Sequence, residues 1–204
     1  MKIIDQKNPL SLDLAKQYLA EGKVICFATD TVYGVAVDAT NSQAVARLYA
    51  LKNRPHEKPV AIFVKNIEYA KKLFVFDSLA TKIAQKHMPG KITMILPTTK
   101  FAKKILAKNL NNGHNEFIGF RIIDSFFVRK LFENFDGILA VSSANKAFEE
   151  PCNSSSKVKK NLKKLDLLIT GKKTDTTSST IIKINNNTLI LIRQGKIKIQ
   201  NYEN

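Results

Sequence analysis

Apolar positions along this chain repeat with two periods, and the changes between them predict where helices and strands lie. Over residues 11–21 apolar side chains return every three or four positions and Gly22 follows, which predicts an amphipathic helix with a glycine stop. Residues 24–28 are an unbroken apolar run of strand length, which predicts a short buried strand. Asn41 precedes a second helical repeat, so we expect it to cap the helix that contains Leu48.

The same two patterns continue to the end of the chain. Further helices are predicted at residues 67–74, 78–87 and about 156–164, and directly after Asp124 as a cap. Further strands are predicted at residues 60–64, 91–96, 117–123, 138–142, 167–169, 180–184, 189–192 and 196–199. Residues 109–115 form a polar loop, and the polar run 174–180 is too short to divide domains. Alternating strands and helices, followed by a strand-rich tail, predict an α/β fold with some antiparallel pairing, as a single domain over residues 1–204.

Composition narrows the class of protein without identifying it. The formal net charge of +16, from 33 basic and 17 acidic residues, suits a polyanion such as RNA or an acidic substrate. Drift toward A/T-rich codons explains the same excess, because most of it is lysine among Asn and Ile, so both interpretations stay open. The charged start at Met1-Lys2 is unlike a signal peptide and no apolar run approaches a membrane span, so we expect a cytoplasmic protein without membrane contact. Cys26 and Cys152 are too few for a disulfide scaffold, and Cys26 is expected in the core.

The arginines stand out against this lysine-rich background. They are Arg47, Arg54, Arg121, Arg129 and Arg193. A lysine serves where a point charge is enough, whereas only arginine offers a planar fork that grips a carboxylate or phosphate with two bonds. Arg54, Arg121 and Arg193 lie in segments rich in other polar groups, which marks these segments as candidate anion sites.

Several familiar sites are missing from the sequence. It contains no glycine-rich phosphate loop and no Gly-x-Ser-x-Gly elbow. Its three histidines lack metal-ligand spacing, so no protein metal site is predicted.

The candidate chemistry lies at predicted strand ends. Residues 29–34, Thr-Asp-Thr-Val-Tyr-Gly, are expected to form a hydroxyl-rich loop after a buried strand. Lys52 and Arg54 follow a predicted helix, and in an extended segment two such side chains point the same way. A cation pair beside a hydroxyl-rich loop suits an anionic ligand. Other strand-end groups that could join this site are Thr93, Arg121, Ser143, Asn145, Ser179 and Arg193.

Read in order, these segments resemble the motifs of the YrdC/TsaC-type threonylcarbamoyl-adenylate synthases. The matching motifs are Thr-Asp-Thr-Val-Tyr-Gly, Lys-x-Arg-Pro, Pro-Gly-x-x-Thr, a strand-ending Arg, Ser-x-Asn, Ser-Thr-Ile and Arg-x-Gly. The resemblance extends from about residue 10 to residue 197, and the chain resembles the short form with one catalytic domain. The resemblance implies an open, twisted mixed α/β sheet with flanking helices and a concave basic face.

The same resemblance implies an activity. It is the conversion of L-threonine, bicarbonate or CO2, and ATP into threonylcarbamoyl-AMP and pyrophosphate, for t6A modification of tRNAs that read ANN codons. A separate threonylcarbamoyl transferase complex would use the product. ATP would be a substrate that carries Mg2+, with no protein-bound cofactor, and weak contact with tRNA or other double-stranded RNA is expected.

The resemblance also implies roles for individual residues. Threonine would be bound by Thr31, Arg121, Ser143 and Ser179. ATP would be bound by Arg54, Lys58, Asn145 and Arg193. Catalytic roles fall to Lys52 and Arg54, and further pocket positions are Tyr33 and Thr93. Arg121 would grip the threonine carboxylate with two bonds. Because a carbamate must attack a phosphate, catalysis would rest on charge neutralisation and alignment.

The chain departs from the family pattern at several positions. Ala28 and Lys91 replace prolines, and Phe63 stands where some members have a histidine. Ala147-Phe148 replaces a Ser-Gly pair, and Phe148 adds bulk near the expected nucleotide. The alternative function is a non-catalytic tRNA-binding or double-stranded-RNA-binding module of the same fold. A carbamoyl-phosphate-using maturation domain is a third candidate, although the cysteine-rich fingers usual in such chains are absent.

Overall fold

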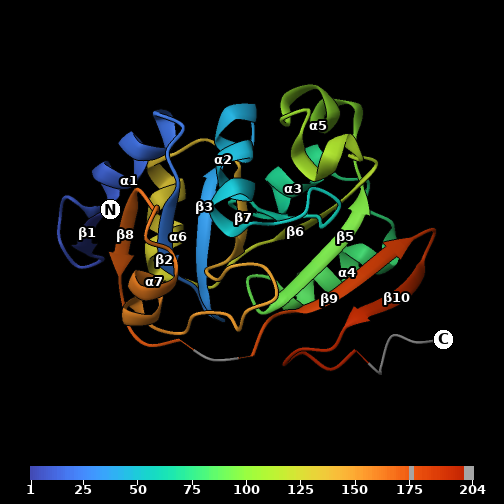
Figure 1. Ribbon diagram of the computed structural model, residues 1–204. Coiled ribbons are helices and arrows are strands. Elements are labelled where there is room, and N and C mark those ends of the chain that lie inside the picture. Colours follow the sequence, from blue (N-terminus) through green and yellow to red (C-terminus); the bar gives the residue numbers. More distant parts are fainter. Residues whose placement is uncertain (175–176, 200–204) are drawn as a thin grey trace.

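The strands of the chain form one open sheet of mixed direction (Figure 1). The computed structural model describes residues 1–174 and 177–199, and within them the sheet has ten strands. Across the sheet their order is β1 (Lys2–Asp5), β8 (Leu167–Thr170), β2 (Ile25–Ala28), β3 (Tyr33–Asp38), β7 (Leu139–Ser143), β4 (Ala61–Phe63), β6 (Phe117–Arg121), β5 (Ile92–Pro97), β9 (Thr180–Asn185) and β10 (Thr188–Arg193). β3 pairs antiparallel with both of its neighbours, while β4 and β6 are parallel. The predicted mixed α/β sheet is confirmed.

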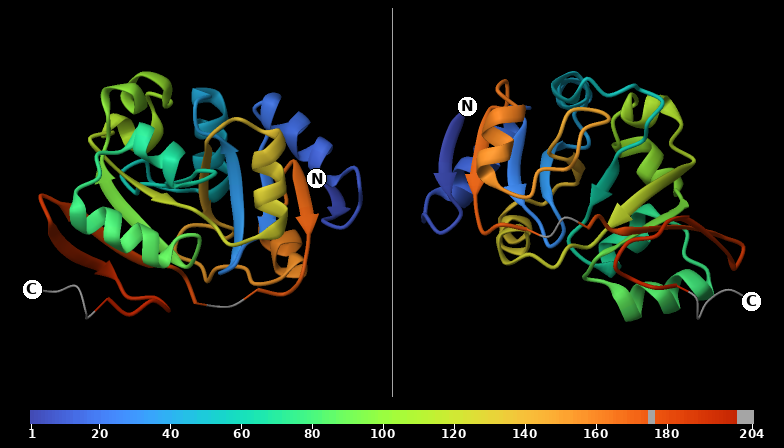
Figure 2. Two further views of the ribbon diagram at one scale, coloured as in Figure 1. Left: turned by 180° about the vertical axis from the view of Figure 1, so that it is seen from behind. Right: turned by 60° about the horizontal axis from the view of Figure 1, so that its bottom comes forward.

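The helices lie on both sides of the sheet. They are α1 (Ser11–Ala20), α2 (Ser42–Lys52), α3 (Ile67–Leu73), α4 (Ser78–His87), α5 (Lys100–Ile105), α6 (Phe126–Asn134) and α7 (Ser155–Asn161), with a short 3-10 helix at Leu110–Gly113. α1 and α6 lie against each other beside β2, β3 and β8 (Figure 2). The larger core is built with α2, α3, α4 and α5. None of the helices in the described ranges is long and apolar enough to cross a bilayer.

The alternation of side chains along the strands explains where a pocket can form. Met94 and Phe120 point into the core under α3, α4 and α5, so Thr93 and Arg121 point to the opposite face. On that face α1 and α6 cover the half of the sheet that contains β8, β2, β3 and β7. The face over β4, β6, β5 and β9 therefore stays open for polar side chains.

Several expected boundaries match the structure and others differ. α4 has the predicted bounds, and Asn41 caps α2 by accepting bonds from the backbone N–H groups of Gln43 and Ala44. Cys26 is in the core as predicted. Asp124 was expected to cap α6, which is wrong, because Ser125 occupies the N-cap position.

Other differences concern whole elements. Residues 196–199 form no strand, and α7 ends at Asn161, before the last two lysines expected in it, Lys163 and Lys164. The sequence prediction contained neither β1, β3 nor α5. β3 matters most, because Tyr33 and Gly34 lie at the start of this central strand rather than in a loop. In the polar run 174–180, residues 175 and 176 lie outside the described part of the chain.

Candidate active site

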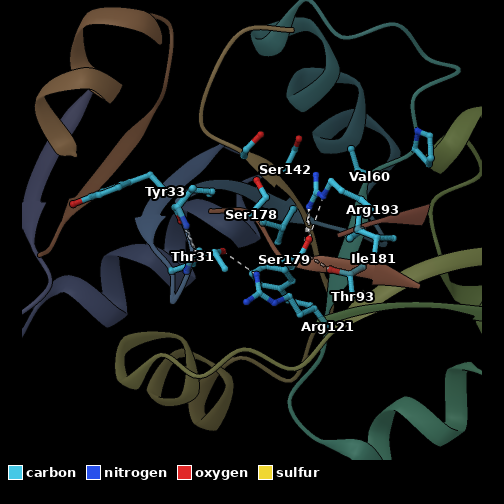
Figure 3. A pocket seen from close by; sticks show the side chains of 18 of the residues that line it. Thr31, Tyr33, Val60, Thr93, Arg121, Ser142, Ser178, Ser179, Ile181 and Arg193 are labelled. Atoms are coloured by element: carbon cyan, nitrogen blue, oxygen red, sulfur yellow. Dashed lines mark hydrogen bonds between the residues drawn. The ribbon is translucent and has the colours of Figure 1, made fainter. Parts of the chain in front are cut away.

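A cavity of about 210 Å³ opens on the uncovered face of the sheet (Figure 3). Most of the residues predicted to form a site line it, although they come from distant parts of the sequence. These residues are Thr31, Tyr33, Arg54, Thr93, Arg121, Ser143, Ser179 and Arg193. Three other predicted site residues, Lys52, Lys58 and Asn145, are not among its lining residues.

The hydroxyl-rich loop between β2 and β3 is held by its first threonine. Thr29 Oγ1 accepts bonds from the backbone N–H groups of Thr31 (3.1 Å) and Val32 (3.2 Å), so the loop carries its own internal turn. This turn places Thr31 Oγ1 3.0 Å from Arg121 Nη1. Tyr33 follows in β3 and directs its ring away from the cavity, where its hydroxyl donates to the carbonyl of Gly171 (3.0 Å). Tyr33 therefore contributes backbone, and not its hydroxyl, to the wall.

Arg121 is fixed by three bonds in three directions. Its Nε donates to the Gly90 carbonyl (2.9 Å), its Nη1 to Thr31 Oγ1 (3.0 Å) and its Nη2 to Asp30 Oδ1 (2.6 Å). Burial lowers the pKa of Arg121 while Asp30 raises it, and burial raises the pKa of Asp30 against the influence of Arg121. Since an arginine has five N–H groups, these bonds leave one N–H on each terminal nitrogen for a ligand.

Two further arginines line the cavity, and in the described part of the chain neither has a carboxylate partner like the one that Asp30 provides for Arg121. Arg54 donates to the carbonyls of Lys58 (3.0 Å) and Pro59 (2.7 Å). Arg193 donates twice to the Ser179 carbonyl, at 3.1 Å and 2.9 Å. Within residues 1–174 and 177–199 no carboxylate forms an ion pair with either side chain. Their bonds to neutral carbonyls orient the guanidinium groups and leave their positive charge for an anion.

The tail of the chain supplies the wall opposite the hydroxyl-rich loop. Thr93 Oγ1 and Ser179 Oγ lie 2.8 Å apart and are both buried. Gly195 explains why the tail can fold back here, since a Cβ on it would lie 2.4 Å from the backbone nitrogen of Thr180 and 2.5 Å from the Ser178 carbonyl oxygen. The glycine therefore allows Arg193 to reach Ser179.

Lys52 and Arg54 do not share an extended segment, so the prediction of a parallel cation pair is wrong. Lys52 is the last residue of α2, and Asn53 ends the helix in the left-handed conformation (φ 46°). Lys52 is fully buried, and its ammonium donates to the carbonyls of Ser143 and Asn145 and to Asn145 Oδ1. Burial lowers its pKa to about 7. Lys52 thus holds the chain beyond β7 instead of facing the cavity.

Asn145 and Lys58 lie in the two loops beside the cavity. Asn145 is buried, and its amide donates to the carbonyls of Lys146 and Glu149, both at 2.7 Å. The ammonium of Lys58 lies 3.7 Å above the ring centroid of Phe148. Phe148, whose bulk was expected near the nucleotide, is 84% exposed and does not line the cavity.

Sequence reasoning missed two kinds of contribution. Asp30 is part of the predicted loop but was assigned no role, although an acid between two threonines was a usable signal for an arginine partner. Ser142 also lines the cavity, and nothing in the sequence distinguishes it from an ordinary strand-end serine. Ser178, which belongs to a predicted strand-end segment but was assigned no role, lines the cavity as well.

The fold and cavity together define a mixed α/β protein whose open sheet face carries a cavity lined by hydroxyl and guanidinium groups, which suits a small ligand with polar and anionic groups. The chain belongs to the Sua5/YciO/YrdC family, whose model, described as "Telomere recombination", matches residues 17–195. The family predicted from the motifs is thereby confirmed.

Individual relatives and solved structures agree with this family. A protein of Methanocaldococcus jannaschii named "Putative threonylcarbamoyl-AMP synthase" is 34% identical over 197 residues, which cover 96% of this chain and 91% of that protein. The threonylcarbamoyl-AMP synthase of Pyrococcus abyssi is 26% identical over 193 residues, and the match covers 93% of this chain but 55% of that protein.

The structural neighbours share the fold. A variant of P. abyssi Sua5 superimposes with a TM-score of 0.88 at 25% identity, covering 99% of this chain and 59% of that one. A second Sua5 structure is a complex with L-threonine, and it has the same TM-score at 24% identity over 98% of this chain and 58% of that one. E. coli YciO has a TM-score of 0.84 at 21% identity over 98% of both chains.

Proposed function

We propose that this protein is a threonylcarbamoyl-AMP synthase, a nucleotidyltransferase that uses L-threonine, bicarbonate or CO2, and ATP. The observation that carries the proposal is the convergence of a hydroxyl-lined wall with Arg54 and Arg193 in one cavity. Arg54 and Arg193 suit a polyphosphate, because neither is neutralised by a carboxylate in the described residues. The names of the relatives and the threonine complex of Sua5 support the same reaction.

The threonine would lie between the loop before β3 and the tail. Arg121 offers one N–H on each terminal nitrogen, which suits the two oxygens of a carboxylate. Thr31, Ser143 and Ser179 line the cavity with hydroxyl groups that can bind the threonine side chain and amine. The Asp30 carboxylate offsets the charge of Arg121, so Arg121 would act by orientation more than by net charge.

The reaction needs alignment more than a covalent relay. The threonine amine adds to CO2 and loses a proton to form a carbamate. A carbamate oxygen then attacks the α-phosphorus of ATP, and the bond from that phosphorus to the leaving pyrophosphate breaks. Arg54 and Arg193 would neutralise the charge that accumulates as two anions approach. Mg2+ would arrive on the triphosphate as part of the substrate. Lys52 would act as a positioning residue, because two of its bonds fix the backbone carbonyls on both sides of Ala144 and the third holds the Asn145 side chain.

The wider setting follows from the proposed product. Threonylcarbamoyl-AMP would pass in the cytoplasm to a transferase complex that modifies tRNA, and the excess of lysine would permit weak contact with that tRNA. We treat residues 1–204 as one catalytic unit, because the sheet is continuous from β1 to β10.

Pyrophosphate release tests the proposal directly. The protein should release pyrophosphate from ATP only when threonine and bicarbonate are both present, and mass spectrometry should find a threonine–carbamoyl–AMP adduct. Arg54→Ala should lower the rate at least 100-fold, as expected for loss of a transition-state charge contact. Arg47→Ala is the matched control, since Arg47 pairs with Asp166 outside the cavity. Release that does not depend on threonine would overturn the proposal.

A further inference from the structure

Phe148 adopts a backbone conformation that favours glycine. Its φ is 68°, in the left-handed region where a β-carbon is strained. The backbone N–H of Glu149 donates to the Lys146 carbonyl (3.2 Å), so Phe148 is the third residue of a four-residue turn. A positive φ at that position usually selects glycine, because glycine has no side chain to strain. The chain therefore accepts a local energetic cost to place an aromatic ring here.

The ring gains nothing from burial that would offset this cost. Phe148 is 84% exposed, more than any other large hydrophobic residue in the described ranges. Its ring lies against the ammonium of Lys58, which is 3.7 Å from the ring centroid. A strained backbone and an exposed aromatic ring together suggest a functional contact rather than a packing role.

Two hydrogen bonds connect the surroundings of the Phe148 ring to residues predicted to bind ATP. Lys58 accepts a bond from Arg54 through its carbonyl (3.0 Å), and Arg54 lines the cavity. On the other side, Asn145 donates to the carbonyl of Glu149 (2.7 Å), the residue after Phe148. Phe148 and Lys58 thus join the two loops that carry the proposed ATP contacts.

We propose that Phe148 is a stacking surface for the purine base of ATP, which deepens the proposed function and rests on it. Lys58 covers one face of the ring, so the base takes the other face, which is open to solvent. Aromatic side chains stack with nucleobases through the π faces of both rings, and this contact needs no hydrogen-bond partner. Arg54 and Lys58, on the neighbouring loop, would then bind the triphosphate, so base and phosphates are bound by adjacent loops.

Binding of two ligands to two variants tests this inference. The ligands are a non-hydrolysable ATP analogue and inorganic tripolyphosphate, which lacks the base, and titration calorimetry measures both. Phe148→Gly removes the ring and relieves the positive φ, so it should fold at least as well as the parent protein. It should weaken binding of the ATP analogue roughly five-fold or more and leave tripolyphosphate binding within two-fold, as expected for loss of one stacking contact.

Phe126 provides a matched control. It is also an exposed phenylalanine (70%) with a lysine ammonium over its ring, that of Lys130 at 6.0 Å, but it lies on α6 outside the cavity. Phe126→Ala should bind both ligands as the parent does. An unchanged affinity of Phe148→Gly for the ATP analogue, or an equal loss for both ligands, would overturn the inference. Failure of the parent protein to bind the ATP analogue at all would instead count against the proposed function.

Discussion

Asp30 Oδ1 lies 2.6 Å from Arg121 Nη2, and the two side chains are only 8% and 5% exposed. The arginine that would meet a threonine carboxylate therefore already holds an internal carboxylate. A buried ion pair recovers little net stability beyond its desolvation cost, but loss of one partner leaves the other charge buried and unpaired. Asp30 thus acts as a positioning residue that keeps the Arg121 guanidinium in one plane.

Asp30→Asn removes the negative charge of this side chain and keeps its shape, so it tests the contribution of the charge alone. The amide oxygen can still accept a bond from Arg121, but the buried guanidinium loses its counter-charge. We expect the free energy of unfolding to fall by about 1–3 kcal/mol, measured by urea denaturation. Glu133→Gln removes the exposed pair with Lys130 and should cost less than about 1 kcal/mol. Equal losses in the two variants would show that burial of the Asp30 pair has no energetic consequence.

Arg121→Lys should affect threonine and ATP differently. A lysine cannot donate along the three directions that Gly90, Thr31 and Asp30 now occupy and still present two parallel N–H groups. The KM for threonine should rise about ten-fold or more, which corresponds to loss of roughly one charge-assisted bond. The KM for ATP should stay within about two-fold, and steady-state kinetics measures both.

A control for this substitution is Arg129→Lys, because Arg129 is exposed and its nearest carboxylate oxygen, on Asp124, lies 3.9 Å away. It should leave both KM values unchanged. A parallel rise of the two KM values in Arg121→Lys would contradict the separate threonine and phosphate regions described above.

Lys52 should make stability depend on pH in a predictable direction. Its pKa in the folded protein is about 7, below the ordinary value of 10.5, because burial disfavours the ammonium. Between these values the unfolded chain binds more protons at this site than the folded chain, so stability rises with pH. Lys52→Met removes this titration. The difference in unfolding free energy between the parent and Lys52→Met should grow between pH 7 and pH 9, by at most about 1.4 kcal/mol per pH unit.

Urea denaturation at several pH values measures this difference, and contributions common to both proteins cancel. Lys52→Met should also be less stable at every pH in this window, because the carbonyls of Ser143 and Asn145 lose their donor. A difference that stays constant with pH would mean that the three acceptors keep the buried lysine charged.

Gly195→Ala should disturb the part of the cavity wall that the segment 178–181 and Arg193 form. The added Cβ would lie within 2.6 Å of three backbone atoms of residues 178–180, and backbone cannot move aside as a side chain can. We expect a loss of roughly 1–3 kcal/mol in stability and a large rise in the KM for ATP, because Arg193 is displaced from Ser179. Lys198→Ala changes an exposed side chain of the same tail and should alter neither quantity. Wild-type kinetics in Gly195→Ala would show that the tail does not shape the site.

The sequence predicted correctly those features that depend on residues close together in the chain. α4 and the cap of α2 were predicted correctly because helix periodicity and an N-cap asparagine act within one or two turns. β3 was missed because its residues Gly34 to Val37 are all buried between β2 and β7, so no alternation marks the strand. Lys52 was misplaced because a Lys-x-Arg spacing cannot reveal that a left-handed Asn53 separates the two side chains.

By itself, the sequence determined the family, the α/β class and most of the polar residues that line the cavity, since the spacing of motifs and local periodicity can both be read along the chain. Only the tertiary structure decided which of those residues carry uncompensated charge. Asp30 neutralises Arg121 from a neighbouring position in space, and Lys52 points inward to backbone carbonyls more than ninety residues away. Whether a cation faces a ligand or a buried acceptor depends on which strands meet in the sheet, and that arrangement is a property of the folded chain.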